Sequence, residues 1–331
     1  MRASSKHSLK IIALALLAAI IFGGGAYYLH ALTNGQNTTK TATKSLPVTT
    51  TATPKKSTKP ISAGGSIGHI FIIMMENRTY SSIVGNPSAP YLNSLIAHSA
   101  LATNYFGVTH PSLPNYLAVT SGSTDSTTTD CNPPGAGCIV NVTNIADSIQ
   151  NSGRTWKAYA EGMPSPCYML NNLSTNFATK HVPFLYYNDI VSNNQRCDSH
   201  VVSYSQLATD LKSAQTTPNF AFITPNLCND MHDCSTSVGD TWLSANVPII
   251  LNSPAFTSSP SLLVITWDEG NAADNHIATI FAGSAAKSGY QNSTAFNHYS
   301  LLHTIEYVWG LKPLTANDQN APLMTSLLTK S

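Results

Sequence analysis

The chain has 331 residues, of which 42% are hydrophobic and 10% are charged, and its formal net charge is +1. Eight of the 17 Lys and Arg residues fall in the first 66 residues, which contain no Asp or Glu. The remainder therefore has nine Lys and Arg residues and all 16 acidic residues, which gives it a net charge of −7. This acidic balance argues against a nucleic-acid-binding protein, which needs clustered positive charge.

The first 32 residues predict a signal peptide or an N-terminal membrane anchor. Arg2, Lys6 and Lys10 precede an uncharged apolar stretch at 11–29, about 19 residues, which is long enough to span a bilayer. Small residues before Leu32 leave cleavage open, and we favour an uncleaved anchor slightly. In both cases the remainder lies outside the cytoplasm, so the protein is expected to be extracellular or at the cell surface, with membrane contact through this segment if it is uncleaved.

Residues 33–66 are rich in Thr, Ser, Lys, Pro and Gly and have almost no large apolar side chains. Such a segment cannot bury enough surface to offset its ordering entropy, so we predict a disordered linker. Residues 67–331 then form the folded domain, whose length suits one large α/β domain.

The domain begins with the continuous apolar run 69–75, which is typical of a central strand buried on both faces. It is followed at once by Glu76 and Asn77. In an open α/β sheet the carboxyl ends of the strands carry the ligand site, and carboxylate and amide oxygens suit a hard cation. The alternative is that Glu76 pairs with Arg78 on a surface turn.

A second strand-like segment, 101–106, leads to Ser112, which lies between prolines on a turn, and then to a helix that includes Pro114 near its start. We expect an exposed Ser112 hydroxyl to be a nucleophile, with the free amides of the helix start facing an oxyanion. Asn115 follows on the same side and could donate its amide to a phosphoryl oxygen. Without support from elsewhere, the pattern is more typical of a simple capped helix.

All six cysteines fall in the exported domain, which favours three disulfides. Sequence proximity suggests Cys131 with Cys138, Cys167 with Cys197, and Cys228 with Cys234, although six cysteines allow 15 pairings. A zinc site is the alternative, but the close C-x-x-C pairs that such sites favour are absent from the sequence.

Two further apolar runs, 219–224 and 261–267, repeat the pattern of a buried strand that stops at a polar cluster. The first leads to 225–233, which contains His232, and the second leads to Asp268 and Glu269. Ends of neighbouring parallel strands are close in space, so these clusters should join Glu76 in one site. Segments 144–151, 204–213 and 241–251 between the strands predict crossover helices.

The last elements are a strand at 276–281, beginning with His276, and an amphipathic helix at 296–311 that stops at Gly310. His298 lies at the start of this helix, free to point into a cleft. A lone histidine there is more often a cap or a satisfied surface group.

Together these residues resemble the bacterial phosphoesterase family that unites secreted acid phosphatases and phospholipases C. The resemblance spans essentially the whole domain and is carried, in order, by MENRTY (75–80), HPSLPNY (110–116), PN to MHD (225–233), GDTWL (239–243), WDEG (267–270) and HYSLL (298–302). It implies an α/β fold, namely the alkaline phosphatase-like three-layer α/β/α sandwich with a mostly parallel central sheet.

The resemblance also implies roles for individual residues. Glu76, Asn77, Asp268 and Glu269 would hold a divalent metal ion that also touches Ser112, and the phosphoryl group would be bound by Asn115 and His232. His298 matches a late histidine that serves a second metal in two-metal relatives. Glu269 stands where those relatives carry a metal-binding histidine, so the number of ions stays open. We also expect His110 and His276 to contact the substrate.

An all-oxygen ligand set favours Ca²⁺ or Mg²⁺, with Zn²⁺ or Mn²⁺ left open. Because only nine Lys and Arg residues are present in the domain, the metal ion and protonated His232 and His298 would have to neutralise the phosphate. Imidazolium ions persist only at low pH, so we expect an acidic pH optimum.

The sequence therefore predicts a monomeric, secreted or surface-anchored, metal-dependent acid phosphatase. It would hydrolyse small-molecule or lipid phosphate monoesters, phosphoinositides included, through a phosphoserine intermediate. The loop 124–141, held by Cys131 and Cys138, is a candidate selector of the substrate. The alternatives are a phospholipase C-type phosphodiesterase and, from another class, a catalytically inactive surface binding module.

Overall fold

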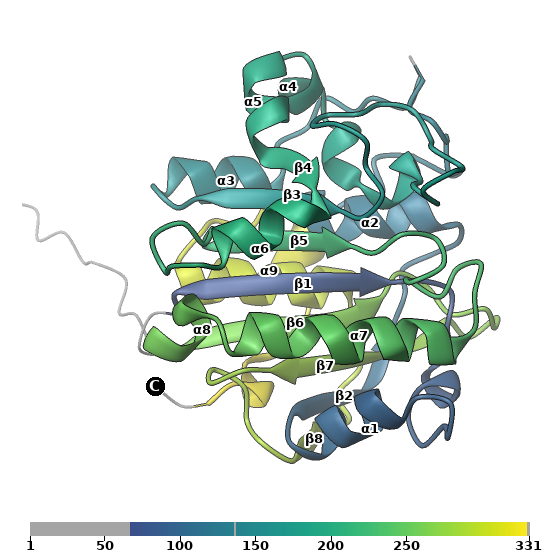
Figure 1. Ribbon diagram of the computed structural model, residues 1–331, viewed down its shortest axis with the longest axis vertical. Coiled ribbons are helices and arrows are strands. Elements are labelled where there is room, and N and C mark those ends of the chain that lie inside the picture. Colours follow the sequence, from purple (N-terminus) through teal and green to yellow (C-terminus); the bar gives the residue numbers. More distant parts are fainter. Residues whose placement is uncertain (1–66, 136, 330–331) are drawn as a thin grey trace, which may run out of the picture. The chain divides into compact units, whose positions relative to one another are not determined.

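A computed structural model describes residues 67–135 and 137–329 (Figure 1). These residues form a nine-stranded sheet in the order β4-β3-β5-β1-β6-β7-β2-β8, with β9 paired to β2. The strands are β1 (His69–Met75), β2 (Ala100–Phe106), β3 (Trp156–Ala160), β4 (Val201–Ser203), β5 (Phe220–Thr224), β6 (Ser261–Trp267), β7 (His276–Ala282), β8 (Tyr290–Asn292) and β9 (Phe296–Asn297).

Helices connect these strands. They are α1 (Pro90–Ala97), α2 (Ser112–Ser121), α3 (Ile145–Asn151), α4 (Asn188–Val191), α5 (Asn194–His200), α6 (Leu207–Asp210), α7 (Thr236–Leu251), α8 (Pro254–Ser258), α9 (His298–Trp309) and α10 (Ala316–Asn320). Short 3₁₀ turns occur at η1 (Tyr80–Ser82), η2 (Thr179–His181), η3 (Pro183–Leu185), η4 (Tyr204–Gln206) and η5 (Thr325–Leu327).

The centre of the sheet is parallel. β1 lies between β5 and β6, and Ile72 is paired with Phe222 on one side and Val264 on the other. Every residue of β1 and β6 is buried, which is why both strands appear in the sequence as unbroken apolar runs. β7 is antiparallel to both β6 and β2, so the sheet is mixed but mostly parallel, as predicted.

Helices cover both faces of the sheet (Figure 1). α1 and α7 pack together on one face, while α2 and α9 pack together on the other. All ten residues of α2 are buried, so this helix is a central part of its layer. The predicted three-layer α/β/α architecture is therefore present.

Two element predictions need correction, and some strands were not predicted. Segment 204–213 contains only η4 and the short α6, because the hydroxyls of Thr216 and Thr217 donate to the carbonyl oxygen of Asp210 and end the helix. The last long helix begins at His298, since Phe296–Asn297 pair with β2 and the Asn297 side chain caps the helix. Strands β3, β4 and β8 were not predicted; β3 and β4 extend the sheet beside β5, and β8 pairs with β2.

The three disulfides have the predicted pairing, Cys131–Cys138, Cys167–Cys197 and Cys228–Cys234, so the alternative of a cysteine zinc site is wrong. The predicted N-terminal anchor and linker lie outside the described residues. Within 67–135 and 137–329, none of the helices combines the length and the apolar character needed to cross a membrane.

Candidate active site

The carboxyl ends of β5, β1 and β6 bring one polar cluster together. Backbone hydrogen bonds connect the segments that follow these three strands. The Glu76 amide donates to the Asp230 carbonyl oxygen (2.8 Å), and the Asp268 amide donates to the Met75 carbonyl oxygen (3.0 Å). Glu76, Asp230 and Asp268 are all fully buried. The three segments that end in polar residues are thus adjacent in space.

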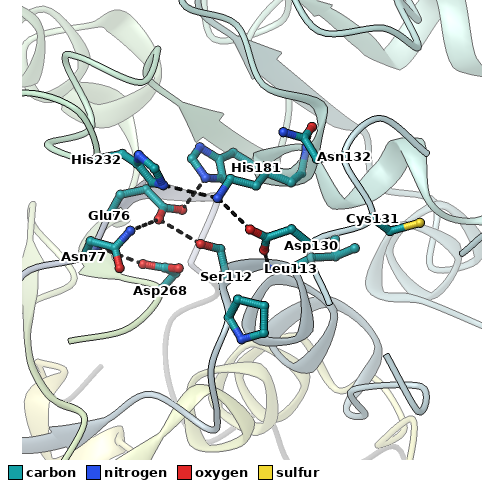
Figure 2. Close-up of polar contacts among 12 residues, drawn as sticks. Glu76, Asn77, Ser112, Leu113, Asp130, Cys131, Asn132, His181, His232 and Asp268 are labelled. Atoms are coloured by element: carbon teal, nitrogen blue, oxygen red, sulfur yellow. Dashed lines mark hydrogen bonds and ion pairs between the residues drawn. The ribbon is translucent and has the colours of Figure 1, made fainter. Parts of the chain in front are cut away.

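Glu76 is the centre of this cluster (Figure 2). Its Oε2 accepts hydrogen bonds from Ser112 Oγ (3.2 Å) and Asn77 Nδ2 (3.3 Å). Its Oε1 accepts one from the Tyr116 hydroxyl (2.6 Å) and lies 3.0 Å from His181 Nε2. The alternative pairing of Glu76 with Arg78 is wrong, because Arg78 donates instead to backbone carbonyl oxygens and to a threonine hydroxyl.

Ser112 is the first residue of α2 and is only 1% exposed, so the expectation of an exposed hydroxyl is wrong. Its Oγ points at Glu76, and the amide of the next residue, Leu113, donates to Asp130 Oδ1 (3.3 Å). A serine at a helix start has free amides beside it that stabilise negative charge. The hydroxyl and at least one such amide therefore face the same cluster.

The buried carboxylates carry more negative charge than their neighbours balance. Burial, followed by the charges of Asp268 and Asp230, raises the pKa of Glu76 well above its ordinary value. Burial and the charge of Glu269 raise the pKa of Asp268 to about 7. Asp268 Oδ2 is also buried without a hydrogen-bond partner. Such a group of carboxylates is stabilised by a bound cation, so these residues fit a divalent metal ion.

Two ligand sets share Glu76. One is the predicted set with Asn77, Ser112, Asp268 and Glu269. The other joins Glu76 to His181 and His232, whose ligand atoms all lie within 4.8 Å of one another. In the second set, however, His232 Nε2 is 3.2 Å from the Lys180 ammonium group, whose hydrogen bond takes the lone pair that a metal would need. The geometry therefore favours the first set.

Four residues of the cluster were missed by the sequence analysis: Asp130, Lys180, His181 and Asp230. Lys180 Nζ donates to Asp130 Oδ2 (2.8 Å), and His181 Nδ1 lies 3.1 Å from Asp230 Oδ2. Burial, followed by the positive charge of Lys180, lowers the pKa of His181 well below its ordinary value. One signal was available, since Lys180 and His181 end an uncharged stretch, 162–179, in a domain that has few cations.

Asn115 does not have the predicted role. Its Oδ1 accepts from the amides of Val108 (2.8 Å) and Thr109 (3.1 Å), and its Nδ2 donates to the carbonyl oxygens of Thr109 (2.8 Å) and Pro111 (3.1 Å). Both donors and both lone pairs of the amide are thereby used. Asn115 holds the loop before Ser112 and has no hydrogen left for a phosphoryl oxygen.

His298 also differs from the expectation. Its Nε2 donates to the Asp268 carbonyl oxygen (2.6 Å), so its Nδ1 accepts from the Tyr105 hydroxyl (3.1 Å). Burial lowers the pKa of His298 to about 4, an effect only partly offset by the hydrogen bond to Asp268. The ring is therefore neutral and fully paired, and it positions Asp268 rather than serving as an imidazolium ion for phosphate.

The remaining predicted residues lie at different distances from the cluster. His110 Nδ1 is 2.6 Å from Glu269 Oε2, and the His110 side chain is 48% exposed, so this pair lies at the rim. Burial and the charge of Asp130 raise the pKa of Glu269 to about 7. His276 stacks on Tyr80 and its Nε2 donates to a backbone carbonyl oxygen, which gives its ring a packing role.

His232 is placed by its own loop. Its Nδ1 lies 2.6 Å from Asp233 Oδ1, its amide donates to Asp230 Oδ1 (2.7 Å), and its Nε2 faces Lys180. The ring is partly exposed and adjoins His181. His232 therefore lies on the open side of the cluster, where a substrate can reach it.

Comparison with known proteins shows the family of this chain. The model of the phosphoesterase family matches residues 86–312, more than half of the chain. The chain belongs to the phosphoesterase family. Members of this family are hydrolases, and the residues matched include Ser112, Asp230 and Asp268. The predicted family and enzyme class are confirmed.

Two relatives illustrate this membership. A phosphatidylinositol-3-phosphatase from Mycobacterium tuberculosis is 34% identical over 267 residues, which cover 80% of this phosphoesterase and 84% of that protein. An acid phosphatase from Aspergillus fumigatus is 29% identical over 280 residues, or 81% of this chain and 60% of that protein.

Solved structures support the fold. A protein of the alkaline phosphatase superfamily from Vibrio parahaemolyticus superimposes with a TM-score of 0.57 at 13% identity, covering 82% of this chain and 76% of that one. At this identity the likeness shows the architecture alone, and it confirms the predicted fold class.

Proposed function

We propose that this phosphoesterase is a metal-dependent acid phosphatase that hydrolyses phosphate monoesters through a phosphoserine intermediate on Ser112. The observation that carries the proposal is the hydrogen bond from Ser112 Oγ to Glu76 Oε2 (3.2 Å), inside a group of buried carboxylates in which the pKa of Glu76 is raised well above its ordinary value. A serine hydroxyl in such surroundings is suited to nucleophilic attack.

In the first step Ser112 Oγ attacks phosphorus, the bond from phosphorus to the ester oxygen breaks, and the alcohol leaves with the proton that the serine hydroxyl gives up, so that a phosphoserine remains. Glu76 Oε2 accepts the Ser112 hydrogen bond and so fixes the direction of the Oγ lone pairs. In the second step water attacks the same phosphorus, the bond from phosphorus to Ser112 Oγ breaks, Oγ takes up a proton from the water, and inorganic phosphate leaves. The Asn115 hydrogen bonds keep the preceding loop in place throughout.

Glu76, Asn77, Asp268, Glu269 and Ser112 would hold the metal ion. When bound, a divalent cation acts as a Lewis acid that lowers the pKa of the serine hydroxyl and neutralises charge on the phosphoryl oxygens. The oxygen-only donor set supports Ca²⁺ or Mg²⁺ over softer ions.

The substrate class is proposed from the relatives. One relative is named for a phosphorylated inositol lipid and several others are named acid phosphatases, which supports phosphate monoesters, lipid headgroups among them, as substrates. Three disulfides support an oxidising compartment and hence export. We further propose that the folded domain works as a monomer.

The proposal is tested with Ser112→Ala in the metal-replete full chain, assayed with p-nitrophenyl phosphate. We expect kcat to fall at least about 1,000-fold, because the covalent step is lost. Ser121→Ala is the matched control, since Ser121 is a buried serine at the other end of α2 and should leave turnover within about threefold. Acid-quenched wild-type enzyme should carry labelled phosphate from ³²P-substrate, and Ser112→Ala should carry none. Turnover retained by Ser112→Ala would remove the covalent mechanism.

A further inference from the structure

Lys180 is an unusual residue in this domain. It lies in η2 with its side chain only 9% exposed, although residues 67–331 contain just nine Lys and Arg. A buried ammonium group is costly unless an anion pairs with it. Most other Lys and Arg residues with described partners bind groups outside this cluster. Arg78 donates to backbone carbonyl oxygens, Arg196 pairs with Asp147 and Asp189, and Lys157 pairs with Asp210.

The partner of Lys180 is Asp130, and this carboxylate bridges two donors. Asp130 Oδ2 accepts from Lys180 Nζ (2.8 Å), and Asp130 Oδ1 accepts from the Leu113 amide (3.3 Å). The ammonium group and the amide therefore converge on the two oxygens of one anion. Leu113 directly follows Ser112, and Figure 2 shows Asp130 beside Ser112 on the side away from Asp268.

The two donors are buried, whereas the anion is partly exposed to solvent. Leu113 is buried in α2, and Lys180 is held on its other side by His232 Nε2 (3.2 Å). Asp130 has a side chain that is 30% exposed, and it lies in the connection between α2 and α3. A rotation of this side chain towards solvent would move the carboxylate away from both donors. The donors would then be free beside the nucleophile.

We propose that Lys180 and the Leu113 amide bind the phosphoryl group of the substrate, and that the Asp130 carboxylate occupies this position until the substrate displaces it. This inference rests on the proposed function, because it takes Ser112 as the nucleophile. A phosphoryl oxygen replaces Asp130 at both donors, and Lys180 supplies the positive charge that an arginine would otherwise provide. Asp130 is thus an internal competitor of phosphate.

The experiment measures the inhibition constant Ki of inorganic phosphate against p-nitrophenyl phosphate, with metal-replete full-length enzyme. Lys180→Met should raise Ki roughly 10- to 100-fold, since a charge-assisted hydrogen bond is lost. Asp130→Asn keeps the size of the side chain but removes its charge, and it should lower Ki roughly 3- to 10-fold. Lys157→Met removes a paired lysine away from the cluster and should leave Ki within about twofold.

Two results would overturn the inference. An unchanged Ki in Lys180→Met would show that Lys180 does not bind the phosphoryl group. A raised Ki in Asp130→Asn would show that Asp130 is needed to hold Lys180 and does not compete with phosphate. Circular dichroism checks folding, and if Lys180→Met does not fold, Lys180→Arg takes its place: a Ki within about tenfold of wild type supports a binding cation, and a larger rise contradicts it.

Failure of the proposed function gives a different result. If the wild-type enzyme hydrolyses no monoester, calorimetric titration with inorganic phosphate replaces the inhibition assay. Binding that Lys180→Met weakens and Asp130→Asn strengthens would support the phosphate site while rejecting the phosphatase. Phosphate binding that neither substitution changes would reject the inference itself.

Discussion

Asn115→Asp is the substitution that best separates the two roles considered for Asn115. The change replaces the amide nitrogen by an oxygen of almost the same size. Oδ1 can still accept from the amides of Val108 and Thr109. The new oxygen, however, would face the carbonyl oxygens of Thr109 and Pro111, which lie 2.8 and 3.1 Å from the present Nδ2.

The cost follows from these contacts. Two hydrogen bonds of about 1 kcal/mol each are lost, and an acceptor is buried against two other acceptors, so the free energy of unfolding should fall by about 2 to 4 kcal/mol. For a domain of this size the melting temperature should fall by about 5 to 15 °C. Because the loop before Ser112 loses its support, kcat should fall about 10- to 100-fold, with little change in KM.

Urea unfolding followed by circular dichroism measures the first effect, and steady-state kinetics with p-nitrophenyl phosphate measure the second. Asn104→Asp is the control, since Asn104 makes one exposed hydrogen bond to the Ser293 carbonyl oxygen and the change should cost less than about 1 kcal/mol. A variant that keeps its melting temperature but binds inorganic phosphate tenfold more weakly would refute the reasoning and restore Asn115 as a phosphate ligand.

Three further predictions follow from the same structure. Exhaustive dialysis against EDTA should abolish turnover, and Ca²⁺ or Mg²⁺ should restore it better than Cu²⁺. Full activity after chelation would mean that Glu76 and Asp268 do not bind a metal ion that catalysis needs. Because its pKa is about 4, His298 is neutral above pH 5. His298→Asn should therefore lower kcat/KM by a similar factor at every pH from 5 to 8. A loss of activity confined to low pH would show that His298 acts as an imidazolium ion. Burial and the neighbouring Asp318 raise the pKa of Glu306 to about 9. The folded state therefore keeps a proton that the unfolded chain releases above about pH 4.5. The contribution of Glu306 to stability is full below that pH and falls as the pH rises towards 9. Glu306→Gln should remove this loss, which reaches up to about 3 kcal/mol at pH 7 in thermal or urea unfolding, and a variant with the wild-type pH profile would contradict the assignment.

The sequence alone determined the parts of the fold that depend on local pattern. The unbroken apolar runs of β1, β5 and β6 predict buried parallel strands, because a strand covered on both faces needs no polar alternation. The polar residues directly after these strands, with Glu76 and Asp268 among them, could be placed at one edge of the sheet for the same reason. Sequence proximity also suggested the disulfide pairing, which the tertiary structure then selected from the 15 that six cysteines allow.

The tertiary structure decided which side chains meet and in which state of protonation. Asp130 and Lys180 are 50 residues apart, and neither follows a central strand, so nothing local joins them. Asn115 and His298 were expected to serve the substrate, yet their hydrogen bonds are taken by the backbone of Thr109 and Asp268. Side-chain direction and burial arise only when distant segments pack. They fix the free hydrogen-bonding groups and the pKa values on which catalysis depends.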